Sequence, residues 1–190
     1  MTQELKRNRK GFTMIVIGID PGKGGGISII NNQIIKEIYK CPNTIKEMAE
    51  ILRPYKLTWD FKAPIVAYIE QVHAFPTDGR SSAFKFGVNY GIWQGLLGAF
   101  SIETKFVVPQ VWMKPLGLPK DKKERKQKIK SLAQNVIDKQ KSLKNKRITL
   151  HTSDAVLIAM YGYLKEVVEH MDIEKKLEVY KIFKQREESK

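Results

Sequence analysis

The chain has 190 residues, a length that suits one domain with a sizeable core, and its 42% content of hydrophobic residues excludes disorder throughout. A formal charge of +14 and a pI of about 9.7 indicate an anionic partner, most simply a nucleic acid. The alternative is that the charge only keeps the protein soluble, and we favour the nucleic acid. A single cysteine, Cys41, excludes an internal disulfide or a cysteine-rich zinc site. We therefore expect an intracellular protein in a reducing compartment. It should have no membrane partner, because its apolar stretches are too short to span a bilayer.

Both ends of the chain are charged and differ from the apolar middle. Residues 1–13 are basic and polar. For this basic N-terminal extension we favour a flexible arm that attracts DNA over a weak organelle-targeting signal or an upstream start. Residues 169–190 alternate in charge and carry a few apolar side chains, which predicts a charged helical tail. One domain at residues 14–168 would lie between these two segments.

Apolar patterns predict strands and helices that alternate along most of the chain, which indicates an α/β fold without an internal repeat. Short apolar runs between turn residues predict strands, and apolar spacings of three and four predict helices. Two turns, at 24–26 and at 31–32, separate three strands that would form an antiparallel meander. In chain order we expect strands at 14–20, 27–30 and 33–40, a helix at 44–55, a strand at 65–70, a helix at 83–100, a short strand at 105–108, a basic helix at 121–140 and a last core helix at 151–168.

Acidic residues close or open three of the predicted elements. Asp20 ends the first strand and Glu70 ends the strand at 65–70, while His151 and Asp154 begin the last helix. Because His151 and Asp154 are three residues apart, we expect their side chains to share one face of its first turn. Such oxygen ligands suit Mg²⁺, which also keeps several of its waters. The pattern indicates a site that cleaves phosphodiesters with Mg²⁺, in which these four residues are catalytic and hold the metal.

Each of these residues also has a purely structural interpretation. Asp20 stands before Pro-Gly, where an aspartate often bonds its own backbone in a turn, although the following glycines leave room for a metal and a phosphate. Glu70 can pair with one of the many lysines, and Asp154 is favoured by the helix dipole. His151 can be a ligand that favours Mn²⁺, a proton donor, or a helix-terminal residue bonded to the backbone.

Three motifs resemble, in order and approximate spacing, those of RuvC-type Holliday junction resolvases. They are Ile17-Gly18-Ile19-Asp20-Pro21-Gly22, Ile69-Glu70-Gln71-Val72 and His151-x-x-Asp154-Ala155. Further stretches are similar to the phage and chloroplast branch of that family, namely Asp78-Gly79-Arg80-Ser81-Ser82-Ala83-Phe84, Gly87-x-x-Tyr90-Gly91-x-Trp93 and Pro109-Gln110-x-Trp112. The similarity covers roughly residues 14–168. Two aspartates occupy the positions of His151 and Asp154 in the commonest bacterial members, so the chain departs from that pattern at His151.

The resemblance implies an RNase H-like α/β fold, a mixed five-stranded sheet flanked by helices, for a nuclease domain at 14–168. It also implies a homodimer that nicks a four-way DNA junction symmetrically with Mg²⁺, for which Mn²⁺ can substitute. In the resembled family the glutamate matching Glu70 bridges two Mg²⁺ ions with the first-strand aspartate, and ions about 4 Å apart can clamp the attacking and leaving oxygens. The implied processes are DNA recombination and repair, in a phage or virus, a cytoplasm or an organelle.

Basic residues concentrate between Lys114 and Arg147, where thirteen Lys and Arg against three acidic residues give +10 of the total +14. The basic helix has one apolar face, so its other face is expected to meet phosphates; a solvated charged face is the alternative. Phe75 follows the second acidic motif and is expected to stack on a base or wedge into a junction, unless it folds back onto the core. The expected DNA contacts are Phe75, Arg80, Lys114, Lys120, Lys122, Lys123, Arg125, Lys126 and Arg147.

Glycines repeat every four residues in the helix at 83–100, at Gly87, Gly91 and Gly95. A glycine inside a helix costs about 1 kcal/mol relative to alanine, which suggests that backbones approach closely there. The helix would pack either against the sheet or across a two-fold axis in a homodimer.

Three other functions compete with junction cleavage. The first is an RNase H-like nuclease on flap or RNA-containing substrates, and the second is a non-catalytic protein that binds branched DNA. The third is an actin-like kinase, because its phosphate loops also open with Asp-x-Gly. We disfavour the kinase because no second glycine-rich phosphate loop precedes the last helix, and we disfavour the non-catalytic protein because all three acidic positions are present.

Overall fold

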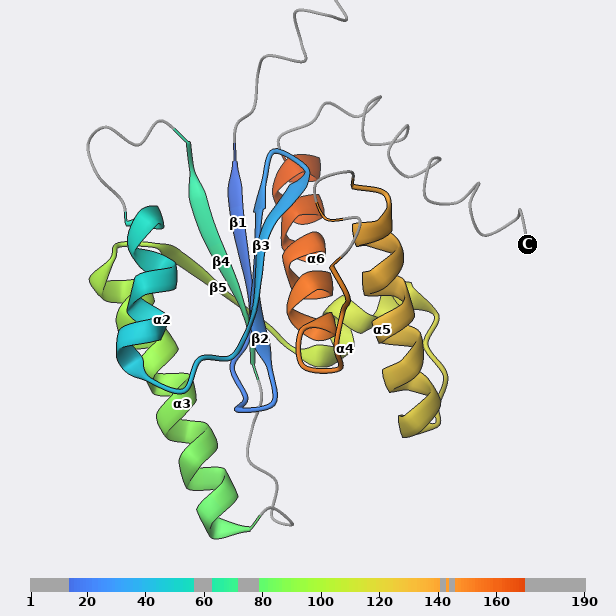
Figure 1. Ribbon diagram of the computed structural model, residues 1–190, viewed down its shortest axis with the longest axis horizontal. Helices are drawn as coiled ribbons and strands as arrows, with labels where there is room; N and C mark the ends of the chain where they lie inside the picture. Colours follow the sequence, from blue (N-terminus) through green and yellow to red (C-terminus); the bar gives the residue numbers. More distant parts are fainter. Residues whose placement is uncertain (1–13, 57–62, 72–78, 141–142, 144–145, 170–190) are drawn as a thin grey trace, which may run out of the picture.

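A five-stranded mixed sheet lies between two layers of helices (Figure 1). The structure is a computed structural model that describes residues 14–56, 63–71, 79–140, 143 and 146–169. Its strands are β1 (Ile15–Asp20), β2 (Gly26–Asn31), β3 (Ile34–Lys40), β4 (Ile65–Glu70) and β5 (Glu103–Val107). Its helices are α2 (Ile45–Leu52), α3 (Arg80–Ala99), α4 (Pro109–Met113), α5 (Lys122–Asp138) and α6 (Ser153–Glu169), with short 3₁₀ turns η2 (Arg53–Tyr55) and η3 (Lys114–Leu116).

The strand order brings two carboxylates to one edge of the sheet. The order is β3-β2-β1-β4-β5, with β1, β2 and β3 antiparallel and with β1, β4 and β5 parallel. The register of β1 with β4 runs from Ile15 opposite Ile65 to Ile19 opposite Ile69. Asp20 and Glu70 come directly after Ile19 and Ile69. Because parallel strands end on the same side of a sheet, the two carboxylates lie next to each other at this edge.

Strand β1 is buried on both faces, which explains its continuous apolar sequence. Ile15, Ile17 and Ile19 belong to a core formed with α2 and α3. Val16 belongs to a second core, formed with α5 and α6 on the opposite face. Two cores therefore hold the central strand in place.

Helix α6 lies directly against β1 because Gly18 has no side chain. A Cβ atom at Gly18 would lie 2.3 Å from the backbone nitrogen of Ala159, which is closer than real Cβ atoms approach. Helix α6 contacts β1, β2 and β4. The start of this helix is thus fixed relative to the strand ends that carry Asp20 and Glu70.

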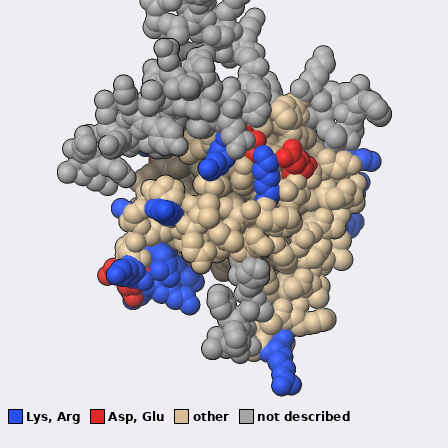
Figure 2. Space-filling model, turned by 180° about the vertical axis from the view of Figure 1, so that it is seen from behind, with Lys and Arg blue, Asp and Glu red and all other residues tan. Residues whose placement is uncertain are grey.

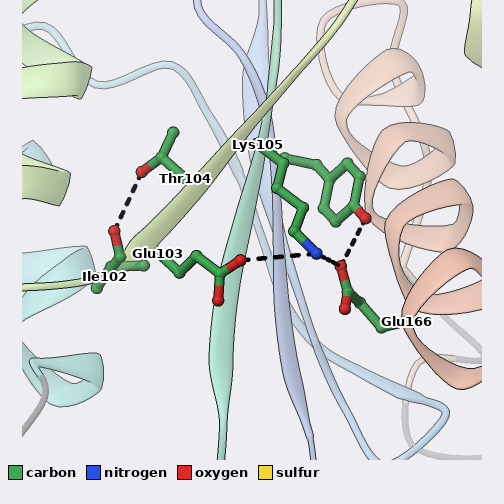
Figure 3. Close-up of polar contacts among 6 residues, drawn as sticks. Ile102, Glu103, Thr104, Lys105 and Glu166 are labelled. Atoms are coloured by element: carbon green, nitrogen blue, oxygen red, sulfur yellow. Dashed lines mark hydrogen bonds and ion pairs between the residues drawn. The ribbon is translucent and has the colours of Figure 1, made fainter. Parts of the chain in front are cut away.

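A partly buried ionic contact also joins α6 to the sheet (Figure 3). Glu166 of α6 is buried, and its Oε1 accepts hydrogen bonds from Tyr68 Oη and Lys105 Nζ, both at 2.6 Å. Lys105 lies 3.6 Å from Glu103 as well. Glu166 therefore links α6 to Tyr68 of β4 and to Lys105 of β5.

The predicted α/β fold is confirmed, with shifted boundaries and one omission. The sheet and the order of its strands and helices agree with the expectation. Helix α3 begins at Arg80, three residues earlier than expected, and α4 with η3 was not predicted because five residues are too short to show a helical period. The predicted extension at 1–13 and the tail beyond Glu169 lie outside the described residues. None of the helices in the described ranges has the length and apolar character needed to cross a membrane.

Candidate functional site

Three carboxyl groups meet where β1 and β4 end and α6 begins. Asp20 is the last residue of β1, Glu70 is the last residue of β4, and Asp154 is the second residue of α6. The charge of Asp154 acts on Asp20, and the charges of both aspartates act on Glu70. The structure therefore brings together the three acidic residues that the sequence indicated.

Burial raises the pKa of all three groups, and repulsion between carboxylates adds to the effect at Asp20 and Glu70. Burial, followed by repulsion from Asp20 and Asp154, raises the pKa of Glu70 to about 8. Burial, followed by repulsion from Asp154, raises the pKa of Asp20 to about 7, against the opposing effects of the Gly22 amide, His151 and Lys126. Burial also raises the pKa of Asp154. Within the described ranges none of the three forms an ion pair, so their negative charges lack a close counter-ion.

The glycine-rich loop after β1 leaves no space for a side chain beside Asp20. A Cβ atom at Gly25 would lie 2.2 Å from the Asp20 carbonyl oxygen and 2.5 Å from its carboxyl carbon. The loop is closed by Gly25 N–H, which donates to Gly22 O at 2.8 Å. Gly22 N–H also donates to Asp20 Oδ1 at 3.3 Å. Asp20 is thus both a turn residue and a member of the carboxyl cluster, and the two interpretations of the sequence are compatible.

The prediction that His151 and Asp154 share the first turn of the helix is wrong. Helix α6 begins at Ser153, and His151 lies in the preceding turn. The backbone N–H groups of Thr152 and Ser153 both donate to the Thr149 carbonyl, at 3.2 and 3.1 Å, which forms a separate turn ahead of the helix. The threonine hydroxyls stabilise this turn in place of an additional helical turn.

His151 nevertheless points to the glycine loop. Its Nδ1 lies 2.6 Å from the carbonyl oxygen of Gly24. Because a carbonyl oxygen only accepts hydrogen bonds, Nδ1 carries a proton in this contact, and the lone pair of the neutral ring is then on Nε2. His151 is exposed, and its charge is close enough to Asp20 to lower the pKa of that carboxyl. His151 therefore lies on the solvent-exposed side of the carboxyl cluster.

Trp112 is a member of the site that the sequence did not assign. It lies on the short helix α4, and its Nε1 donates a hydrogen bond to Glu70 Oε1 at 2.8 Å. The only signal in the sequence was the stretch Pro109-Gln110-x-Trp112, which carries no periodicity and no titratable group. Fold-level geometry was needed to connect it with Glu70.

Of the expected DNA contacts, Lys126 is close enough to the carboxyl cluster to act on it. Lys126 is exposed on α5, and its charge lowers the pKa of both Asp20 and Asp154. Figure 2 shows Lys and Arg side chains gathered at the lower left, where this view places α5. Phe75 lies outside the described residues. Arg125 is half-buried and donates to the Lys120 carbonyl at 3.1 Å. The remaining predicted contacts, all exposed, are Arg80, Lys114, Lys120, Lys122, Lys123 and Arg147.

The carboxyl cluster fits a cation by its chemistry, although it is not a finished coordination shell. Across the described ranges, no group of three or more His, Cys, Asp and Glu side chains is already arranged to hold a metal ion. The residues do supply oxygen donors of the kind that hard divalent cations prefer. A cation between them would remove the repulsion that raises the pKa of Asp20 and Glu70.

The sheet order, the two helical layers and the carboxyl groups at one sheet edge define an RNase H-like α/β protein. No family model and no curated protein matches the sequence. The structure is similar to that of T. thermophilus RuvC in complex with Holliday junction substrate, with a TM-score of 0.54, 15% identity, and coverage of 84% of this chain and 98% of that chain. Another similar structure is that of Thermus thermophilus RuvC alone, with a TM-score of 0.49, 18% identity and coverage of 78% and 92%. The chain therefore has the RuvC-type fold that its motifs predicted.

Proposed function

We propose that this protein is a metal-dependent endonuclease that resolves four-way DNA junctions by paired, symmetric nicks. One observation carries the proposal: three carboxyl groups without ion pairs among the described residues cluster at the strand ends of an RNase H-like sheet. A cluster of raised pKa values at a sheet edge is typical of a functional site rather than of a structural ion-pair network. The similarity to the fold of RuvC and the strongly basic charge support DNA as the substrate.

Asp20, Glu70 and Asp154 would hold the metal, with Mg²⁺ as the proposed ion and Mn²⁺ as a substitute. When bound, Mg²⁺ supplies charge stabilisation at the phosphate and lowers the pKa of a bound water. His151 has a free Nε2, which can act as a further ligand or accept a proton. Manganese binds imidazole better than magnesium does, so His151 as a ligand would favour Mn²⁺.

The chain's own residues place the scissile phosphate. Four of the five residues from Gly22 to Gly26 are glycines, and Lys23 between the first two is exposed, so the backbone of this loop leaves room for a phosphate to approach the carboxyl of Asp20. Lys126 is exposed beside the cluster and would pair with a phosphate oxygen. Glu70 is fixed in the interior by its hydrogen bond from Trp112. The proposed products are a 3′-hydroxyl and a 5′-phosphate.

A groove along α5 offers a path for the backbone of one duplex arm. It has a volume of about 820 Å³ and lies between α5 and the segment at 146–148. Amide and hydroxyl groups, three cationic side chains, one carboxylate and one apolar side chain line it: Gln127, Lys130, Ser131, Gln134, Asn135, Asp138, Lys146, Arg147 and Ile148. The amide, hydroxyl and cationic groups bind phosphates without reading sequence, which agrees with recognition of junction shape.

Helix α3 is the proposed dimer surface. Its glycines at 87, 91 and 95 are exposed, and a Cβ atom added at any of them would meet no other atom within 4 Å. Of the two alternatives that the sequence left open, packing of these glycines against the sheet is not seen among the described residues. Phe84 and Val88 extend the same face and are 73% and 46% exposed. An exposed apolar face that also permits close backbone approach suits a second copy of the chain.

The substrate range tests this proposal directly. Purified protein would be incubated with labelled four-way junction, flap, duplex and RNA–DNA hybrid in Mg²⁺, with Asp20→Asn as the inactive control. We expect cleavage of the junction above all others and none in EDTA. Preferential cleavage of flap or hybrid would replace junction resolution with a simpler nuclease activity. Binding of junctions without cleavage in Mg²⁺, and also without cleavage when Mn²⁺ replaces it, would indicate a non-catalytic DNA-binding protein.

A further inference from the structure

We infer that Trp112 is a positioning residue that holds the carboxylate of Glu70 ready for the metal. Its indole Nε1 donates to Glu70 Oε1 at 2.8 Å. Both side chains are buried, Trp112 with 1% and Glu70 with 7% of its surface exposed. The inference rests on the proposed function, because it gives Trp112 a part in the metal site described there.

The sheet register places Trp112 at this carboxylate. Val107, the last residue of β5, pairs with Glu70, and Gln71 N–H donates to the Val107 carbonyl at 2.8 Å. Helix α4 begins two residues later at Pro109, whose fixed φ suits the first helical position. One helical turn then returns the chain to the end of β4 at Trp112. The link between Trp112 and Glu70 is therefore built into the strand pairing.

The hydrogen bond restricts the one torsion that would otherwise leave the carboxylate free. The terminal torsion of a glutamate is broad, so an unrestrained carboxylate samples many orientations. The Trp112 indole is held in the core that contains Ile129, Ala133 and Tyr163, which fixes the direction of its N–H. Glu70 Oε1 is then occupied, whereas Oε2 makes no hydrogen bond to any described residue. Oε2 is the oxygen that remains for a metal.

An indole N–H donates but cannot accept or ionise, so it stays a donor at every pH. It can hold a carboxylate without competing for the metal as a lysine or histidine would. Hydrogen-bond partners of ligating carboxylates usually contribute tenfold to 100-fold in metal affinity. We assign a contribution of this size to the Trp112 hydrogen bond.

Two buried tryptophans provide a matched comparison. Trp93 on α3 is 0% exposed and belongs to the opposite core, so Trp93→Phe also removes a buried indole N–H but leaves Glu70 untouched. Mn²⁺ binding by the DNA-free protein would be measured by calorimetry for wild type, Trp112→Phe and Trp93→Phe. We expect Trp112→Phe to bind Mn²⁺ tenfold to 100-fold more weakly, and Trp93→Phe to remain within twofold of wild type. Both variants should bind junctions in EDTA as wild type does.

Equal Mn²⁺ affinity in wild type and Trp112→Phe would overturn the role of Trp112 and leave the proposed function intact. Failure of the wild-type protein to bind Mn²⁺ would instead overturn the proposed metal site itself. A measurement on the unsubstituted chain avoids any folding defect: Mg²⁺ should shift the indole ¹⁵N–¹H resonance of Trp112 and leave that of Trp93 in place. Saturating Mg²⁺ that moves neither resonance would also overturn the inference.

Discussion

Replacing Glu70 with glutamine should stabilise the metal-free protein at alkaline pH. Burial, with repulsion from Asp20 and Asp154, raises the pKa of Glu70 from 4.5 to about 8 in the folded protein. Between these two values the folded protein binds more protons at Glu70 than the unfolded chain does. The free energy of unfolding must therefore fall as the pH rises from about 4.5 to about 8.

The size of this effect follows from the same two values. At about 1.4 kcal/mol per pH unit, the difference between 4.5 and about 8 corresponds to about 5 kcal/mol. This figure is an upper limit, because water that enters the site when Glu70 ionises reduces the penalty. Glutamine keeps the shape and an oxygen acceptor for Trp112 but does not ionise. We expect Glu70→Gln to gain about 2 to 5 kcal/mol over wild type at pH 8 and little at pH 5.

Urea unfolding in EDTA, followed by circular dichroism at pH 5, 6, 7 and 8, would measure this difference. Glu50→Gln is the control, since Glu50 lies on the exposed face of α2, 4.0 Å from Lys46. The wild type and Glu50→Gln should lose stability together as the pH rises, whereas Glu70→Gln should lose less, its remaining loss coming from Asp20, whose pKa is also raised. Mg²⁺ should restore the wild type at pH 8. Parallel curves for all three proteins would refute the reasoning about the carboxyl cluster.

Three further predictions concern DNA binding, the dimer and the metal. Asp20→Asn should abolish nicking while junction affinity persists or rises, because removal of a negative charge weakens the repulsion of the phosphate. Gel-shift and cleavage assays would check this, and nicking at the wild-type rate would remove Asp20 from the site. Lys126→Gln should reduce the slope of log affinity against log salt by about 0.9, measured by fluorescence anisotropy, whereas the exposed control Lys46→Gln should not; equal slopes would remove Lys126 from the DNA surface. Gly91→Leu should give monomers in sedimentation that bind duplex but lose paired nicks, and a dimeric variant would place the interface elsewhere.

His151 allows a test of its role within the site. His151→Asp should preserve cleavage in Mg²⁺ better than His151→Ala does, because a carboxylate can replace an imidazole as ligand. The cleavage rates of both variants in Mg²⁺ and Mn²⁺ would measure this. Equal, complete loss in both variants would indicate that the imidazole has a special role, such as proton transfer at Nε2.

The sequence was sufficient to predict an element where one physical cause determined the residues of that segment. Strand β1 is buried on both faces, so its residues had to be apolar, and its carboxylate at the open end was visible as an exception. The same holds for Glu70 at the end of β4. Parallel pairing then brings the two ends together, which a family resemblance could suggest and only the fold could show.

Other parts of the site depend on tertiary contacts that produce no periodic pattern in the sequence. The start of α6 was predicted two residues too early because Thr149 and Thr152 form a separate turn, and the same residues could otherwise have formed the first turn of the helix. Trp112 lies on a helix of five residues and reaches Glu70 only through the pairing of β4 with β5. The glycines of α3 were compatible with either of two packing partners until their surroundings were known.

Cleavage of a supercoiled plasmid that extrudes a cruciform tests the central claim most directly. Two metal sites related by a two-fold axis should cut both strands within one binding event. We therefore predict that, in Mg²⁺, the wild-type protein converts the plasmid to the linear form without accumulation of the nicked circle, and that Asp20→Asn leaves it supercoiled. Accumulation of nicked circle alone, or linear product from Asp20→Asn, would contradict the account.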